Sequence, residues 1–302
     1  MLFWTIVKVA VKSLLANKLR SVLAMLGIII GVAAVISMLA LGAGAQKRIM
    51  DRISSMGANL MIVRPGQAGH RGVRSGSSQT LTLEDARALL DEVPEVKTVA
   101  PVVQGNGQFK YYGKNAQSAI TGTSITYFSI RNFEVEKGRT FTESEVEQAA
   151  RVAILGATTV ENLFEDADPL QEKIKISGIN FKVIGVLKAK GDQGWFNPDD
   201  QAIIPYTTAM KQILGVDYLR EIDMQTIDDA DHEKVQTEAS KVIRRRHRIQ
   251  SEDDDDFHIR DLAEMAETAS EVTQTFTLLL GAVAGISLVV GGIGIMNIML
   301  VS

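Results

Sequence analysis

Two long apolar segments lie near the ends of this sequence, and most of the charged residues lie between them. Val22–Leu41 has Ser37 as its one clearly polar residue, and Leu278–Leu300 carries no charge. A helix rises about 1.5 Å per residue, so about twenty apolar residues span the ~30 Å hydrocarbon core of a bilayer. The pattern therefore predicts two transmembrane helices that flank a polar domain of roughly 230 residues.

Helical periodicity continues beyond both apolar segments. Residues 1–20 predict an amphipathic helix at the membrane interface, with Lys8 and Lys12 on the face opposite its apolar residues. Gln46–Ile53 prolongs the first apolar helix, and Asp261–Thr275 leads into the second. Both transmembrane helices are therefore expected to carry stalk extensions.

The segment between the stalks mixes strand and helix patterns, which predicts an α+β domain. Thr82 and Asp85 form a capping-box variant at the start of a helix over Leu83–Glu92. The other helix candidates are Glu143–Ala149, Thr158–Phe164, Thr208–Leu214 and Asp231–His247. The strand candidates are Leu60–Arg64, Val96–Val103, Gln108–Tyr112, Gln117–Gly122, Arg151–Leu155, Lys173–Ile176, Phe181–Leu187, Gln201–Ile204 and Ile222–Thr226.

The charge distribution predicts the orientation of the chain. Residues 1–20 contain only basic charges, from Lys8, Lys12, Lys18 and Arg20, while the whole chain has a net charge of −4. Because basic residues beside a transmembrane helix tend to stay in the cytoplasm, the N-terminus is expected inside and the domain outside. The same balance suits membrane lipids as a partner and gives no reason to expect nucleic acid.

The domain shows little that could carry chemistry. The chain has no cysteine, and its four histidines lack the spacing of metal ligands. It has no P-loop, so ATP hydrolysis is expected on a separate subunit, and no nucleophile–base pair that would make it a hydrolase. We therefore predict no enzyme activity, cofactor or metal. The acidic run Ser251–Asp256 predicts a solvated loop, and the basic run Arg244–Arg248 predicts a helix end whose cations complement the helix dipole.

The apolar segments carry glycines four residues apart, Gly27 with Gly31 and Gly281 with Gly285. Small residues at this spacing let helices approach closely in lipid, so these four glycines are predicted helix-packing residues. Neither segment contains a charge of the kind that ion and proton pathways use. The two helices are therefore not expected to form a conduction path.

Several stretches resemble the MacB/FtsX-like ABC-transporter permease family. The most specific is the block Gly291–Ser302, and residues 39–46 and Gly57–Gly66 also match. Weaker matches to the family's MacB-like periplasmic core domain occur in the family's order. They are Arg151–Gly156, Phe181–Val186, Ile204–Tyr206 and Asp255–Phe257.

The resemblance implies a bacterial inner-membrane, multi-pass permease that forms homodimers, binds a cytoplasmic ABC ATPase and can use an adaptor protein. It implies that ATP-driven motion reaches the outer domain by mechanotransmission, in efflux or in lipoprotein or peptide handling. Family members continue beyond a second transmembrane helix, so this chain is expected to be truncated there. The outer domain is expected to be a porter-like unit with an inserted small subdomain.

The predicted boundaries are an interfacial helix at 1–20, a transmembrane helix at 21–43, a stalk at 44–58, a porter-like part at 59–130, an inserted subdomain at 131–214, a second porter-like part at 215–260, a stalk at 261–275 and a transmembrane helix at 276–301. Trp195 and Phe196, in a Gly- and Asp-rich loop, are candidates for a partner contact or for the domain core. The alternative function is a two-transmembrane sensor, which needs a cytoplasmic output domain after the second crossing.

Overall fold

The computed structural model describes residues 4–6, 18–56, 59–66, 69–70, 73–74, 79–165, 167–191 and 197–300. The chain forms two compact units, one made of Met1–Asp51 with Ala266–Ser302 and the other of Arg52–Met265. Most of the predicted interfacial helix at 1–20 lies outside the described residues.

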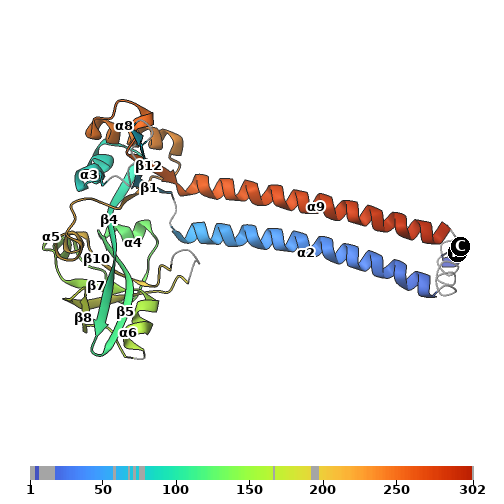
Figure 1. The fold of residues 1–302 in the computed structure, drawn as a ribbon, viewed down its shortest axis with the longest axis horizontal. Coiled ribbons are helices and arrows are strands. Elements are labelled where there is room, and N and C mark those ends of the chain that lie inside the picture. Colours follow the sequence, from blue (N-terminus) through green and yellow to red (C-terminus); the bar gives the residue numbers. More distant parts are fainter. Residues whose placement is uncertain are drawn as a thin grey trace. The chain divides into compact units, whose positions relative to one another are not determined.

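The first unit is built from two long antiparallel helices, α2 (Lys18–Met56) and α9 (Leu262–Leu300), which lie side by side (Figure 1). Gln46 Nε2 donates to Ser270 Oγ at 3.1 Å, and Gly42 faces Thr277. Two stretches, Met25–Met50 and Leu262–Ile293, are long and apolar enough to cross a membrane. The assignment of their ends as stalks stays a prediction.

Small residues line the seam between these helices. Half-buried positions recur on α2 at steps of four, three, four and seven residues, which fits a 3.5-residue period typical of helices wound into a left-handed pair. The seam includes Gly31, Val35, Met38, Gly42 and Ile49 on α2 and Ser270, Thr273, Thr277, Gly281 and Ala284 on α9. The Thr273 and Thr277 hydroxyls donate to carbonyls one turn earlier, so the seam buries no unpaired threonine hydroxyl there.

The second unit begins with a split β-α-β arrangement. Its strands lie in the order β12-β1-β11-β4, and each neighbouring pair is antiparallel. Two helices, α3 and α8, connect these strands, and both contribute to one core cluster with them. The bounds are β1 (Leu60–Pro65), α3 (Leu83–Glu92), β4 (Val96–Tyr111), β11 (Glu221–Thr226), α8 (His232–His247) and β12 (Phe257–Asp261).

The rest of the domain is a small closed barrel. Strand pairing runs from β4 to β5, β10, β7, β9 and β8 and returns to β4, where Phe109 lies opposite Ile176. Each of these six strands has a neighbour on both sides, and the interior of the circuit is filled by Phe109, Ile120, Ile174 and Phe181. The bounds are β5 (Lys114–Thr123), β7 (Val152–Leu155), α6 (Ala157–Phe164), β8 (Lys173–Ile176), β9 (Ile179–Leu187) and β10 (Gln201–Pro205).

Shorter elements complete the domain. A second core cluster forms outside the barrel, where α4 and α5 contribute Phe128 and Val146 and pack against Val152 and Ile184. The bounds are β2 (Gly69–His70), β3 (Val73–Arg74), α4 (Thr126–Ile130), β6 (Val135–Gly138), α5 (Glu143–Glu147), α7 (Tyr206–Thr208), the π-helix η1 (Ala209–Leu214) and the 3-10 helix η2 (Glu252–Asp254).

The predicted mixture of helices and strands is confirmed, and so are the bounds of α3 and its capping box. The predicted division of one strand is wrong: Val96–Val103 and Gln108–Tyr112 are parts of a single strand, β4. Between the two predicted segments lie Gly105 and Gly107, where Leu214 and Ile120 occupy the space that a side chain would need. β6, β12 and α4 were not predicted.

The predicted division at 59–130, 131–214 and 215–260 stays a prediction. Strand pairing crosses its first boundary, because β5 lies parallel to β10. The porter-like character of the outer parts likewise stays a prediction.

A buried charge network joins α4 to the split β-α-β sheet. Arg131 donates to both carboxylate oxygens of Asp223, at 2.5 and 2.8 Å, and to Glu221 at 2.9 Å. Arg64 donates to the other oxygen of Glu221 at 2.6 Å. Two carboxylates that water cannot reach are thus balanced by two guanidinium groups.

The first prediction concerns this network. Arg131→Ala leaves Asp223 without its bidentate partner, and we expect the free energy of unfolding to fall by about 3–5 kcal/mol. Arg139→Ala is the control, because Arg139 pairs with Glu145 at the surface and its loss should cost less than about 1 kcal/mol. Urea denaturation of the detergent-solubilised chain, followed by circular dichroism, measures both. Equal losses would contradict the role given to Arg131.

Candidate functional site: the junction of β1, β12 and α9

Both long helices continue into neighbouring strands of one sheet. β12 ends at Asp261 and α9 begins at Leu262, with no residue between them. α2 ends at Met56, and β1 begins at Leu60. β1 and β12 are antiparallel neighbours, and Met61 lies opposite Asp261. The strand that leads into α9 and the strand that follows α2 are therefore joined by backbone hydrogen bonds.

Asp261 fixes the first turn of α9 to the domain. Its Oδ1 accepts from the backbone N–H of Ala263 at 2.8 Å, which caps the helix, and its Oδ2 lies 2.6 Å from His232 Nδ1 at the start of α8. The Asp261 side chain is only 6% exposed, and Leu262 packs into the second core cluster. The carboxylate thus connects three elements at the point where α9 begins.

Asn59 holds the entry to β1. It adopts a left-handed backbone conformation with φ of 54°, which asparagine tolerates better than most residues. Its side-chain amide donates to Asp228 Oδ1 at 3.1 Å, and its carbonyl accepts from the Thr226 N–H at 3.1 Å. The start of β1 is thereby tied to the end of β11.

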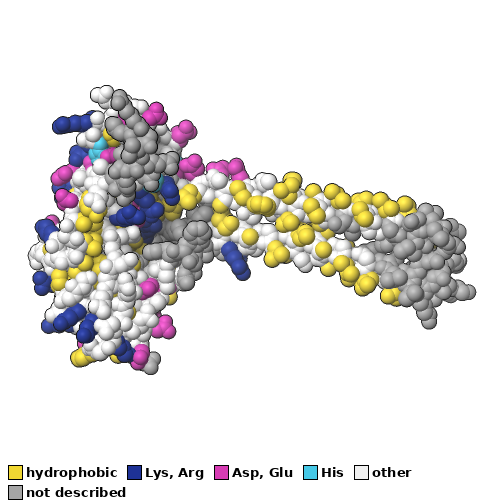
Figure 2. All heavy atoms as spheres, in the orientation of Figure 1, with side chains coloured by type: hydrophobic (Ala, Val, Ile, Leu, Met, Phe, Trp, Pro, Cys, Tyr) yellow, Lys and Arg dark blue, Asp and Glu magenta, His cyan; other side chains and the backbone are white. Residues whose placement is uncertain are grey.

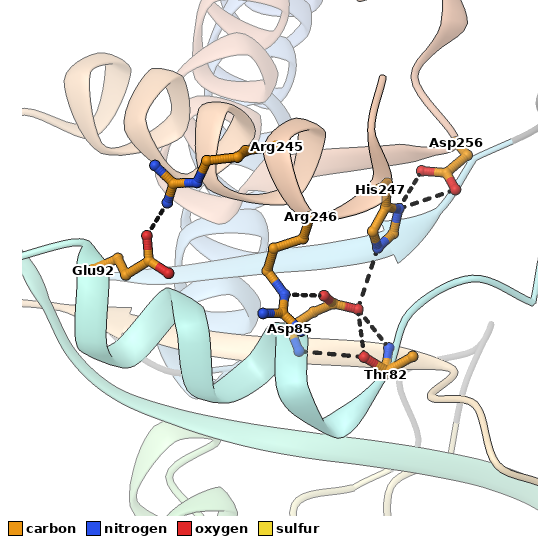
Figure 3. Close-up of polar contacts among 7 residues, drawn as sticks. All are labelled: Thr82, Asp85, Glu92, Arg245, Arg246, His247 and Asp256. Carbon is orange, nitrogen blue, oxygen red and sulfur yellow. Dashed lines mark hydrogen bonds and ion pairs between the residues drawn. The ribbon is translucent and has the colours of Figure 1, made fainter. Parts of the chain in front are cut away.

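A polar cluster connects α3, α8 and the segment before β12 (Figure 3). His247 at the end of α8 places Nδ1 2.8 Å from Asp256 Oδ1 and Nε2 3.2 Å from Asp85 Oδ2. Arg246 Nε donates to the other oxygen of Asp85 at 2.6 Å, and the Thr82 N–H donates to Asp85 Oδ2 at 2.8 Å as part of the capping box of α3. A histidine with a carboxylate at each ring nitrogen donates to both only as the imidazolium.

The cluster shifts two pKa values in opposite directions. Burial alone would raise the pKa of Asp85, but the hydrogen bonds from His247, Arg246 and Thr82 outweigh it and hold that pKa well below its usual range. The hydrogen bond to Asp85 raises the pKa of His247, burial opposes this, and Asp256 adds to the rise. The folded domain therefore favours the ionised carboxylate of Asp85 and the protonated imidazolium of His247 more than the unfolded chain does.

The acidic run Ser251–Asp256 and the basic run Arg244–Arg248 contact each other in this cluster. Arg244 binds Asp255 with two hydrogen bonds of 2.8 and 2.7 Å and Glu252 with one of 2.7 Å, and Arg245 pairs with Glu92. The interpretation of the basic run as structural agrees with these contacts. The prediction of a solvated acidic loop is wrong for Asp255 and Asp256, because both form ion pairs with α8.

The structure places the four predicted helix-packing glycines differently. Gly31 and Gly281 are half-buried on the seam between α2 and α9, whereas Gly27 and Gly285 are exposed. A Cβ added at Gly27, Gly281 or Gly285 meets no described atom within 4 Å. Their packing role stays a prediction, and Gly42, which the glycine spacing did not single out, makes the close approach to Thr277.

Trp195 and Phe196, the predicted partner contact, lie outside the described residues. Among the residues that are described, no three His, Asp or Glu side chains are grouped so that they could hold a metal ion. A cavity of about 280 Å³ lies beside the middle of β4, lined by residues that include Val103, Leu214 and Arg220.

Comparison with known proteins finds close relatives. A family model described as the MacB-like periplasmic core domain matches residues 21–242. A protein from Bdellovibrio bacteriovorus named Macrolide export ATP-binding/permease protein MacB is 40% identical over 294 residues, 96% of this chain and 45% of that protein. A protein of the same name from Chlorobaculum tepidum is 43% identical over 296 residues, 97% of this chain and 45% of that protein. The chain thus spans less than half the length of these curated relatives.

Two solved structures share the fold. The periplasmic region of MacB from Actinobacillus actinomycetemcomitans matches with a TM-score of 0.61 and 23% identity, over 73% of this chain and 97% of that one. The extracellular domain of the noncanonic ABC-type transporter YknZ from Gram-positive bacteria matches with a TM-score of 0.57 and 19% identity, over 67% of this chain and 100% of that one.

The second prediction tests the cap of α9. Asp261→Ala removes the oxygen that binds the Ala263 N–H, and we expect amide exchange over residues 262–265 to become roughly 5–30 times faster. Asp261→Asn keeps a capping oxygen and should preserve most of the protection. Thr142→Ala removes the cap of α5 and should affect that helix alone. Unchanged exchange at the start of α9 in Asp261→Ala would disprove the anchor.

The third prediction concerns pH. Because the pKa of His247 is raised, its contribution to stability is complete below its ordinary value of 6.5 and is lost as the pH rises through the higher folded value. Because the pKa of Asp85 is lowered, its contribution is present above 3.8 and is lost as the pH falls through the folded value. The melting temperature of His247→Gln should therefore fall further below that of the parent chain at about pH 5.5 than at about pH 8.

His258 provides a control for which the opposite change of stability with pH is expected. Burial lowers the pKa of His258, and the positive charges of Arg260 and Arg64 add to this, so its protonation opposes folding. His258→Gln should therefore gain relative stability at about pH 5.5 compared with about pH 8. Parallel pH profiles for the two variants would contradict the assignment of His247.

Proposed function

Because the chain belongs to the family of MacB-like periplasmic core domains, we propose that it is the N-terminal part of the permease of an ABC-type exporter or of a lipoprotein- or peptide-handling complex. In this proposal, ATP-driven motion generated in the cytoplasm passes through α2 and α9 into the domain. The two helices act as levers, and the substrate does not pass between them.

One observation supports the proposal most directly. β12 continues into α9 without a linker, and β12 pairs with β1, the strand that follows α2. A flexible connection would absorb motion, whereas a capped helix joined to a paired strand transmits it. Asp261 and Asn59 strengthen the two connections. The uncharged apolar faces of α2 and α9 suit contact with lipid or other helices more than a path for ions.

The membrane arrangement follows from the same helices. We place α2 and α9 across the bacterial inner membrane as part of a multi-pass protein, with Arg52–Met265 outside the cytoplasm. The glycines at 27 and 285, which are exposed in the single chain, suit packing against a second copy or against further helices of a longer protein.

The proposed partners are an ATPase, a second copy of the chain and an adaptor protein. The curated relatives are named as ATP-binding and permease proteins, so the ATPase belongs either to the same longer polypeptide or to a separate subunit. Their names also include macrolide export, which makes macrolides one candidate cargo beside peptides and lipoproteins.

Hydrogen exchange tests the proposal directly. The complete gene product is purified with its ATPase, and amide exchange is followed with ATP and with a non-hydrolysable analogue. We expect ATP turnover to change exchange in β1, in β12 and over residues 262–265. A stable complex in which these segments do not respond to ATP would refute the relay, and an output domain for signalling in place of an ATPase would favour the sensor.

The fourth prediction uses an engineered, reducible disulfide between α2 and α9. An ideal Cβ at Gly42 lies 3.5 Å from Thr277 Cβ, within the range for a disulfide, and the chain has no other cysteine. If the relay requires α2 and α9 to shift along their seam, the oxidised Gly42→Cys/Thr277→Cys variant should lose most of the ATP-dependent change in exchange and regain it on reduction. Each single variant, treated identically, is the control. Full response of the oxidised variant would exclude such a shift.

A further inference from the structure

Four lysines lie together on the outer surface of the barrel. Lys110 on β4 is directly opposite Lys175 on β8, and Lys173 on β8 is directly opposite Lys182 on β9. Directly paired residues on antiparallel strands project to the same side, as do residues two apart on one strand. Lys110, Lys173, Lys175 and Lys182 therefore share one surface, named here the lysine face, and all four are exposed.

The lysine face is an integral part of the barrel wall. The residues that alternate with the lysines, among them Phe109, Ile174 and Phe181, point inward and are fully buried. Their burial fixes the strand register, because a slip by one residue would exchange buried and exposed positions. The backbone positions that carry the four lysines are consequently fixed relative to one another. Figure 2 shows Lys and Arg side chains, with Asp and Glu side chains among them, at the end of the domain where β8 lies in Figure 1.

The charges of the lysine face are not compensated within the described chain. None of the four lysines forms an ion pair with a described residue, and the described outward-facing residues of β4, β5, β8 and β9 around them include no acid. Glu172 precedes Lys173 in the sequence but forms no ion pair with any of the four lysines. Some other lysines of the domain do pair with acids, as in Lys114–Glu165 and Lys234–Glu95.

This arrangement works against the stability of the isolated domain. Like charges directly opposite each other on neighbouring strands repel, and the barrel contains two such pairs side by side. The chain as a whole has a net charge of −4, so acidic residues that could have neutralised these lysines are plentiful. A surface that concentrates unpaired positive charge in this way attracts and orients a partner of opposite charge.

The residues around the lysines favour a protein over a lipid surface. Asn115 lies opposite Lys110, Asn180 lies opposite Lys175, and Gln108 lies opposite Gln117. Amide side chains both donate and accept hydrogen bonds, which suits the mixed groups of a polypeptide. Stable attachment to a bilayer needs buried apolar area beside positive charge, and the outward residues here are polar.

We propose that the lysine face is a docking surface for an acidic surface of a partner protein. Strands in a sheet are about 4.8 Å apart and alternate residues of one strand about 6.7 Å apart, so the lysines form a zigzag of positive charge. Carboxylates at alternate positions of a strand, or one turn apart on a helix, match this spacing. The proposal is independent of the relay through α2 and α9, because it concerns a separate surface.

Two matched variants test the proposal in the full chain, reconstituted in neutral phosphatidylcholine nanodiscs. The face variant carries Lys110→Gln, Lys173→Gln, Lys175→Gln and Lys182→Gln. The control variant loses the same charge at lysines that form ion pairs, through Lys114→Gln, Lys188→Gln, Lys234→Gln and Lys241→Gln. The probe is a fluorescent peptide in which Glu alternates with Thr, compared with the same peptide carrying Gln in place of Glu.

We expect fluorescence anisotropy to show salt-sensitive binding of the Glu peptide, weakened about tenfold or more in the face variant and by less than about threefold in the control variant. The melting temperature of the face variant should not fall, since the change removes repulsion. Absence of binding to the parent chain, or equal weakening in both variants, would overturn the proposal. Lysine-dependent binding to phosphatidylglycerol vesicles without binding to the peptide would also overturn it, in favour of a lipid surface.

Discussion

The antiparallel pairing of β1 with β12 is the constraint on which the rest of the structure depends. These two strands are the points at which the long helices meet the domain, and they lie next to each other at one side of the split β-α-β sheet. Sliding of these strands is resisted because it breaks backbone hydrogen bonds, and a slip by one residue would also move buried residues to the wrong face. The ends of α2 and α9 therefore arrive at positions that the sheet itself defines.

Buried charge supports this constraint from several directions. Arg131 holds Asp223 and Glu221 on the strand beside β1, Asp261 holds α8 and α9 together, and His247 connects α8 with α3. Each of these contacts depends on direction, and the loss of one partner would leave a buried polar or charged group unpaired. Each contact therefore favours one arrangement of the elements that it joins. Apolar packing alone would hold the same elements with less preference for a particular angle.

Local features of the chain were predictable from the sequence, and long-range ones were not. The apolar runs and the Thr82–Asp85 capping box depend on neighbouring residues, and both were found. The contact between His232 and Asp261 joins positions 29 apart, and that between Arg131 and Asp223 joins positions 92 apart. Nothing in the spacing of these residues indicates that topology brings them together. The family resemblance named the fold class but not these contacts.

The barrel illustrates the same limit. Most of its strands were predicted from the sequence. The closure of the barrel through β8 depends on the pairing of Phe109 with Ile176, which no local sequence pattern indicates. Lys110, Lys173, Lys175 and Lys182 looked like ordinary solvent-facing positions of separate strands. Only the register of β4, β8 and β9 shows that they form one surface.

The length of β4 has a geometric consequence. This strand has 16 residues, so it extends for about 50 Å; its first part pairs with β11 and its second part with β5. A rotation of the first sheet by about five degrees would thus carry the distant hairpin tip through roughly 4 Å, if the strand stays straight. If the proposed relay turns the sheet near the helix attachments, this continuous strand would convert a small angle there into an ångström-scale displacement at the far end of the barrel.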